Sequence, residues 1–152
     1  MYLPPIKEVA VTLAATHRLA RLYVPIQSGS ERVLKLMRRQ CDLDRVKNIL
    51  KCIRAAVPAG RNLTIGTSII VGFPSETLEE LQMTIDLCKE VHFDWIWCHS
   101  YSARPETAAA SMGMQIGADE ILRRARTAKV HLKAQSLVTT AEDQAGSRTC
   151  QG

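Results

Sequence analysis

Three short polar loops hold most of the residue types that could do chemistry in this chain of 152 residues. Each loop follows a run of β-branched or aromatic residues and is therefore predicted to begin where a strand ends. The loops are residues 27–30 (Gln-Ser-Gly-Ser), 72–76 (Gly-Phe-Pro-Ser-Glu) and 101–105 (Tyr-Ser-Ala-Arg-Pro). In parallel α/β folds the loops at the C-terminal ends of the strands form the ligand site. The pattern predicts one binding site built from all three loops.

The polar groups of these loops suit a small polar ligand. The amide of Gln27 and the hydroxyls of Ser28 and Ser30 match ribose hydroxyls or a carboxylate. Ser68 stands among isoleucines in the strand before the second loop and is expected to point into a cavity, while the phenol of Tyr101 could contact an anion. The structural alternatives stay open: a helix cap for the first loop, a bond from Ser68 to a neighbouring carbonyl, and a packing role for Tyr101.

The cysteines do not form a metal-binding pattern. Their spacing is long and irregular, without any C-x-x-C or C-x-x-x-C pair. The five positions are Cys41, Cys52, Cys88, Cys98 and Cys150. The chain also lacks a Walker loop and a Gly-rich dinucleotide fingerprint, so no metal ligand and no phosphate cradle is predicted.

Positive charge gathers in two stretches that are predicted to be helical. Residues 31–61 carry nine Lys or Arg and three Asp or Glu, and residues 118–135 carry five and two. With a net charge of +5, these basic helices are expected to suit an anionic partner such as RNA. Ordinary solvated helix faces remain the alternative. No apolar run approaches about 18 residues and no signal peptide is recognised, so a cytoplasmic protein without membrane contact is expected.

The elements that must position the loops alternate along the chain. Helices are expected over residues 6–19, 30–39, 42–57, 77–91 and 119–139, and strands over 22–26, 63–71 and 94–100. This order predicts an α/β fold with a parallel sheet of three βα units followed by a long basic helix. We expect one domain over residues 1–140 and a disordered tail over 141–152. Trp95 and Trp97 alternate along the third strand and share one face, where they serve either as core or as a stacking platform.

Taken together, three phrases resemble one family. They are residues 24–34 (VPIQSGSERVL), 69–77 (IIVGFPSET) and 101–108 (YSARPETA). The chain resembles the radical S-adenosylmethionine methylthiotransferases, which modify tRNA adenosines or a ribosomal protein, from about residue 22 to 112. The resemblance implies the C-terminal half of a partial (β/α)6 TIM-like barrel. It also implies that Gln27, Ser28, Ser68 and Tyr101 bind S-adenosylmethionine.

The departures from the family are as informative as the match. Ser75 and Glu106 stand where the family usually has glycine, and the C-x-x-x-C-x-x-C motif that holds the 4Fe-4S cluster is absent. We therefore expect a fragment that is inactive alone. Its first strand would present an unpaired edge to an N-terminal half-barrel or to a second copy of the chain. Two alternatives are a non-catalytic RNA-binding or protein-interaction module and the half-barrel of another radical S-adenosylmethionine enzyme.

Overall fold

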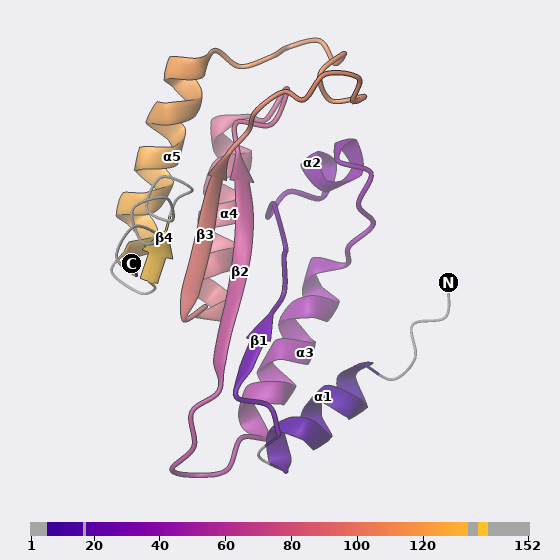
Figure 1. Ribbon diagram of the computed structural model, residues 1–152, viewed down its shortest axis with the longest axis vertical. Helices are drawn as coiled ribbons and strands as arrows, with labels where there is room; N and C mark the ends of the chain where they lie inside the picture. Colours follow the sequence, from indigo (N-terminus) through magenta and orange to yellow (C-terminus); the bar gives the residue numbers. More distant parts are fainter. Residues whose placement is uncertain (1–5, 17, 134–136, 140–152) are drawn as a thin grey trace, which may run out of the picture.

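The computed structural model describes residues 6–16, 18–133 and 137–139 of the chain (Figure 1). Helices and strands alternate, as the sequence predicts. In chain order the elements are α1 (Ile6–Ala15), β1 (Arg21–Tyr23), α2 (Glu31–Leu36), α3 (Leu43–Ala55), β2 (Thr64–Val71), α4 (Leu78–Val91), β3 (Trp95–Ser100), α5 (Ala118–Lys133) and β4 (Leu137–Thr139). None of the described helices is long and apolar enough to cross a bilayer.

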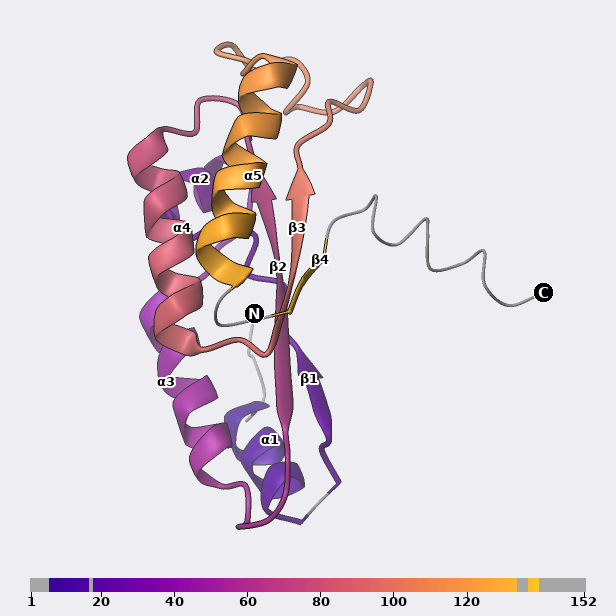
Figure 2. The same ribbon diagram turned by 90° about the vertical axis from the view of Figure 1, so that its left-hand side faces the viewer.

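The strands form one parallel sheet in the order β1-β2-β3-β4, which confirms the predicted α/β class. Helices α3, α4 and α5 lie on the same side of this sheet, and in the described part of the chain no helix lies on the opposite side (Figure 2). We call the side turned away from these helices the inner face. The strand register places Gly66 opposite Trp95 and Ser68 opposite Trp97, and all four residues belong to this face.

The core lies between the sheet and the helices. The alternate positions of β2 and β3 point toward the helices, and Ile65, Ile69 and Ile96 are fully buried there. Leu34, Ile53 and Ile85 meet them from the helical side. The sheet face that is turned toward the helices is therefore packed with buried apolar side chains. The inner face remains available for functional groups.

Local signals in the sequence explain where most helices begin. Ser30, Asp42 and Thr77 each accept a hydrogen bond from a backbone N–H in the first turn of the helix that follows. Thr77 and Glu80 also complete the predicted capping box of α4, because the Glu80 carboxylate accepts from the Thr77 N–H.

Several boundaries differ from the prediction: α1 ends at Ala15 instead of about Leu19, and α2 ends at Leu36 instead of about Arg39. The last helix ends at Lys133 instead of about Thr139, because residues 137–139 pair with β3 as a strand. Such a short strand depends on its neighbour and leaves little trace in local sequence. Strand β1 ends at Tyr23. The Val24 N–H still donates to the Gly66 carbonyl of β2 at 2.9 Å, Pro25 has no N–H to donate, and backbone pairing with β2 resumes at Gln27. The expected disordered tail lies outside the described residues.

Candidate functional site

A cavity of about 540 Å³ lies at the C-terminal ends of β2 and β3, on the inner face. Its lining combines polar and aromatic side chains: Tyr23, Gln27, Ser68, Ile70, Phe73, His99, Ser100, Tyr101, Ser102, Arg104, Thr107 and Ala109. Gln27, Ser68 and Tyr101 are three of the four residues predicted from the sequence to bind a ligand. The structure thus brings together residues from all three strand ends.

Ser68 is the centre of the polar side of this cavity. Its hydroxyl oxygen accepts a hydrogen bond from the Tyr23 hydroxyl at 2.8 Å and another from the Gln27 amide at 2.9 Å. These two bonds leave the proton of the Ser68 hydroxyl free to donate to a ligand. The predicted alternative, a bond from Ser68 to a neighbouring carbonyl, is not what the structure shows.

Gln27 reaches the cavity through an unusual backbone conformation. Its φ is 75°, in the left-handed region that residues other than glycine seldom adopt. Two hydrogen bonds to β2 hold it there: the Gln27 N–H donates to the Ser68 carbonyl at 2.8 Å, and the Ile70 N–H donates to the Gln27 carbonyl at 2.9 Å. Strain held by surrounding contacts is a recurrent property of ligand sites.

Tyr101 brings an unpartnered hydroxyl group to the lining of the cavity. Its hydroxyl is buried and has no hydrogen-bond partner among the residues that the structure describes. The ring is fixed edge-on against Phe73, with the ring centroids 5.3 Å apart, and the Tyr101 N–H donates to the Val71 carbonyl at 2.8 Å. A buried phenol without a partner is energetically unfavourable, so this hydroxyl is available to a polar atom of a bound molecule or to an ordered water.

The structure does not bring Ser28 to the cavity. Ser28 is fully buried on the opposite side of the loop, where its hydroxyl accepts from the Ser30 N–H and lies 3.4 Å from the hydroxyl of Thr84 in α4. Gly29 donates its N–H to the same threonine. A Cβ on Gly29 would lie 2.5 Å from the carbonyl oxygen of Met83, so this glycine permits close packing on α4 and not close approach to a ligand.

A buried ion pair anchors the second loop to α5. The Glu76 carboxylate accepts from the Gly72 N–H at 2.8 Å and lies 3.6 Å from the Arg124 guanidinium, which also donates to the Glu76 carbonyl at 2.7 Å. Burial raises the pKa of the Glu76 carboxyl above its ordinary value. Arg124 looks like one more charge of the basic helix in the sequence, yet it is 9% exposed and holds the loop in place.

A second ion pair joins the first two loops. The Glu80 carboxylate accepts from the Arg32 guanidinium at 2.6 and 2.8 Å and from the Ser30 hydroxyl at 2.7 Å. Arg32 also donates to the Ser75 carbonyl at 2.7 Å. The hydrogen bonds of Arg32 hold the pKa of Glu80 at about 2, well below its ordinary value.

The two positions where glycine is usual in the resembling family keep a backbone that suits glycine. Ser75 and Glu106 both have φ of 65°. The chain therefore retains the loop geometry although L-residues are strained there.

Sequence reasoning missed Tyr23 as a lining residue. Tyr23 lies two residues before Pro25, in a strand whose faces the sequence does not distinguish. Only the register of β1 on β2, with Tyr23 opposite Gly66, places its ring on the inner face. His99, from β3, also lines the cavity.

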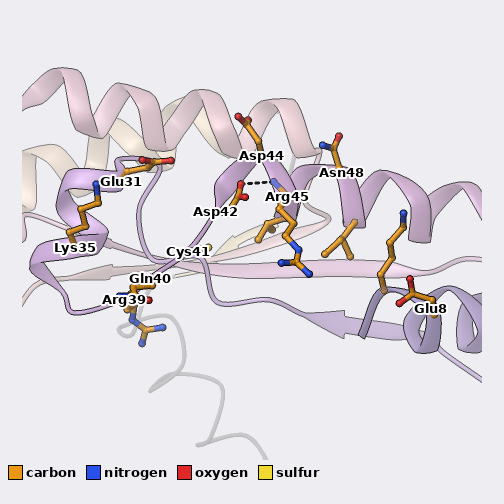
Figure 3. Close-up of a pocket in the computed structure, with 13 residues that line it drawn as sticks. Glu8, Glu31, Lys35, Arg39, Gln40, Cys41, Asp42, Asp44, Arg45 and Asn48 are labelled. Atoms are coloured by element: carbon orange, nitrogen blue, oxygen red, sulfur yellow. Dashed lines mark hydrogen bonds between the residues drawn. The ribbon is translucent and has the colours of Figure 1, made fainter. Parts of the chain in front are cut away.

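A larger groove of about 1240 Å³ lies elsewhere, along α1, α2 and α3 (Figure 3). Acidic and basic side chains are mixed along it, among them Glu31, Lys35, Asp44 and Arg45. None of its lining residues has a buried side-chain polar atom without a partner. We therefore assign the candidate ligand site to the smaller cavity.

Among the described residues no group of three His, Cys, Asp or Glu side chains could hold a metal ion. Cys88 and Cys98 are buried in the core, and Cys41 and Cys52 are partly exposed. The donor set present in the described residues does not fit an iron–sulfur cluster, which needs several thiolates together.

Comparison with known proteins gives a consistent picture. The sequence profile described as the Radical SAM superfamily matches residues 2–88. The chain is 47% identical over 87 residues to a tRNA-2-methylthio-N(6)-dimethylallyladenosine synthase of Chloroflexus aurantiacus, covering 57% of this chain and 18% of that protein. It is 41% identical over 110 residues to the enzyme of the same name from Mycolicibacterium smegmatis, covering 72% of this chain and 21% of that protein. The resemblance stated from the sequence is thereby confirmed.

The fold has a counterpart among solved structures. The chain matches coproporphyrinogen III oxidase (HemN) of Escherichia coli, which is described as a radical SAM enzyme, with a TM-score of 0.71 and 18% identity. The match covers 87% of this chain and 30% of that one. At this identity it shows a shared TIM-like barrel fold, of which the chain contains one part. The chain spans about a fifth of the length of the curated relatives it matches.

Proposed function

Since the chain belongs to the radical SAM superfamily, we propose that it supplies the nucleoside-binding part of a radical S-adenosylmethionine methylthiotransferase active site. The unpartnered Tyr101 hydroxyl carries this proposal. It lies in a cavity that also offers the Ser68 hydroxyl and the Gln27 amide. The residues present fit the adenosine and ribose of S-adenosylmethionine, which offer acceptors and hydroxyls to such groups.

Each residue has a distinct part in this proposal. Ser68 donates its free hydroxyl proton, Gln27 keeps the Ser68 oxygen occupied and oriented, and Tyr101 donates to a second polar atom of the ligand. Arg104 and Ser102 also line the cavity. S-adenosylmethionine, when bound, would be the molecule that is reductively cleaved.

The cluster that donates the electron does not belong to this part of the site. The thiolates would come from outside the described residues, and no C-x-x-x-C-x-x-C motif occurs in the 152 residues. We propose that a cluster-bearing half-barrel completes the sheet beside the edge strand β1, and that the chain alone has no radical activity. The relatives are named for a tRNA nucleoside product, so we also propose RNA as the substrate and the cytoplasm as the location.

Calorimetric titration of S-adenosylhomocysteine into the full chain tests the cofactor part. We expect saturable binding with one site. Tyr101→Phe and Ser68→Ala each remove one hydrogen bond and should weaken the affinity by about 2- to 10-fold. Ser28→Ala is the matched control, because it removes a buried serine hydroxyl that lies outside the cavity.

Two results would count against the proposal. One is an absence of binding by the folded chain. The other is equal affinity in the Tyr101→Phe, Ser68→Ala and Ser28→Ala variants. Iron analysis after anaerobic reconstitution tests the cluster part separately, and a stoichiometric cluster on the chain alone would overturn it.

A further inference from the structure

The first loop passes from the sheet to α4 within three residues. At Gln27 the chain is still bonded to β2, since the Gln27 N–H donates to the Ser68 carbonyl and the Ile70 N–H donates to the Gln27 carbonyl. Two residues later, the Gly29 N–H donates to the Thr84 hydroxyl of α4 at 2.8 Å. The left-handed backbone of Gln27, with φ of 75°, lies at the turn between these two supports. The loop is therefore held on both sides of this turn.

The Thr84 hydroxyl is buried and fixed in direction. The residue is only 1% exposed, and its hydroxyl proton is donated to the Glu80 carbonyl, one helical turn earlier, at 3.0 Å. The Thr84 oxygen is thus left as an acceptor for the Gly29 N–H. Thr84 is not among the residues that line the cavity, so it can influence the cavity only through the loop.

The position of the loop depends on this acceptor. The backbone of Gly29 lies directly against α4, because a Cβ on this residue would fall 2.5 Å from the Met83 carbonyl oxygen. A buried N–H that loses its acceptor is unfavourable, so without the Thr84 hydroxyl the loop would move away from α4. A left-handed conformation is also unfavourable for an L-residue. Gln27 would then return to an ordinary φ, and its side chain would lose its bond to Ser68.

We propose that Thr84 is a positioning residue for the candidate ligand site. It holds Gly29 on α4 and thereby keeps Gln27 in the conformation in which its amide donates to the Ser68 hydroxyl oxygen at 2.9 Å. This role rests on the proposed function, in which the Ser68 hydroxyl donates to the ligand. Side chains that are held in the binding geometry before the ligand arrives give a higher affinity, because less free energy is lost in ordering them.

Calorimetric titration of S-adenosylhomocysteine into Thr84→Val, which keeps the shape of the side chain without the hydroxyl, tests this role. We expect the affinity to fall by about 5- to 10-fold, because only a fraction of the free molecules would keep Gln27 in the binding conformation. Thr84→Ser keeps the hydroxyl and should bind within about twofold of the wild type.

Thr127→Val is the matched control. The Thr127 hydroxyl in α5 donates to the carbonyl of Arg123 at 3.1 Å, four residues earlier, as the Thr84 hydroxyl does in α4. Within the described ranges, however, no loop N–H donates to Thr127. The affinity of this variant for S-adenosylhomocysteine should therefore equal that of the wild type.

A double-mutant cycle shows whether Thr84 acts through Gln27. Gln27→Ala alone should weaken the affinity by about 2- to 10-fold. In that background Thr84→Val should change the affinity by less than about twofold, because the side chain that Thr84 positions is already absent. A fall in affinity that is equal with and without the Gln27 amide would overturn the positioning role.

Amide hydrogen exchange tests the loop anchor without a ligand. The Ile70 N–H is bonded to the Gln27 carbonyl of the first loop, whereas the Tyr101 N–H is bonded to the Val71 carbonyl of β2. Thr84→Val should therefore speed the exchange of Ile70 by about tenfold or more relative to that of Tyr101. An unchanged ratio of the two rates would overturn the positioning role.

These measurements separate the role of Thr84 from the proposed function. A changed exchange ratio, without S-adenosylhomocysteine binding by the folded wild type, would remove the cofactor proposal and keep Thr84 as the residue that holds Gln27. Thr84→Ala is measured in the same way if Thr84→Val does not fold. Failure of both variants to fold, while Thr84→Ser folds, would assign the hydroxyl to stability alone and overturn the positioning role.

Discussion

Replacement of Glu80 by glutamine should destabilise the chain and make its stability less dependent on pH. Glu80 joins Ser30, Arg32 and the N-terminus of α4 through four hydrogen bonds. The fall of its pKa from 4.5 to about 2 corresponds to about 3.4 kcal/mol of interaction that favours the charged form. The Arg32 side chain is 51% exposed, so water screens the pair. We therefore expect a loss of roughly 2 kcal/mol in the free energy of unfolding at pH 7.

The pH dependence gives the sharper test. Because the pKa of Glu80 is lower in the folded state, its contribution is complete above the unfolded pKa and is lost as the pH falls from about 4.5 to about 2. Urea unfolding followed by circular dichroism at pH 7 and pH 3 should show the gap between wild type and Glu80→Gln narrowing.

The control is Asp86→Asn, in the same helix, where the carboxylate is exposed and accepts a hydrogen bond from Gln82. This variant should stay within about 0.5 kcal/mol of wild type. The reasoning fails if Glu80→Gln behaves like the control at pH 7, or if the gap between Glu80→Gln and wild type is equal at both pH values.

Three further outcomes are expected. Gly29→Ala should lower the free energy of unfolding in urea by about 1–3 kcal/mol, because a Cβ at this position meets the backbone of α4. Gly113→Ala is the control and should be near neutral, because the space around Gly113 is open. Equal losses in the two variants would contradict the packing role of Gly29. Glu106→Gly should stabilise the chain by about 0.5 kcal/mol by relieving a left-handed backbone at φ of 65°, and a lower melting temperature would contradict this. Burial raises the pKa of Cys88 to about 12 and of Cys98 to about 11, so iodoacetamide at pH 8 should label the two partly exposed thiols first, as mapped by mass spectrometry.

The sequence predicted well what depends on neighbouring residues. The Ser30 cap, the capping box at Thr77 and the apolar stretch of β2 are local signals, and the structure confirms each. The order of strands and helices followed from these signals. The strand ends then placed Gln27, Ser68 and Tyr101 at a common edge, because parallel strands bring their C-terminal ends together.

What the sequence could not predict depends on pairing between distant segments. Ser28 and Gln27 are adjacent and equally polar, and only the packing of the loop on α4 turns one to the core and the other to the cavity. Tyr23 lies at the site because the register of β1 on β2 places it opposite Gly66. The local sequence of a three-residue strand does not determine this register. Arg124 could be separated from the exposed charges of α5 only by its distance to Glu76.

The unequal length of the strand pairings has a consequence for the order in which the molecule opens. Strand β2 is in register with β3 over six residues and with β1 over three. The longer pairing also closes the shorter connection, through α4, so β2, α4 and β3 form the most persistent cooperative unit. Amide hydrogens of β1 should exchange with solvent through a partial opening that leaves this unit intact. Gln27 and Tyr23 would leave the cavity in that opening, so a ligand held by both should slow the exchange of β1 more than that of β3.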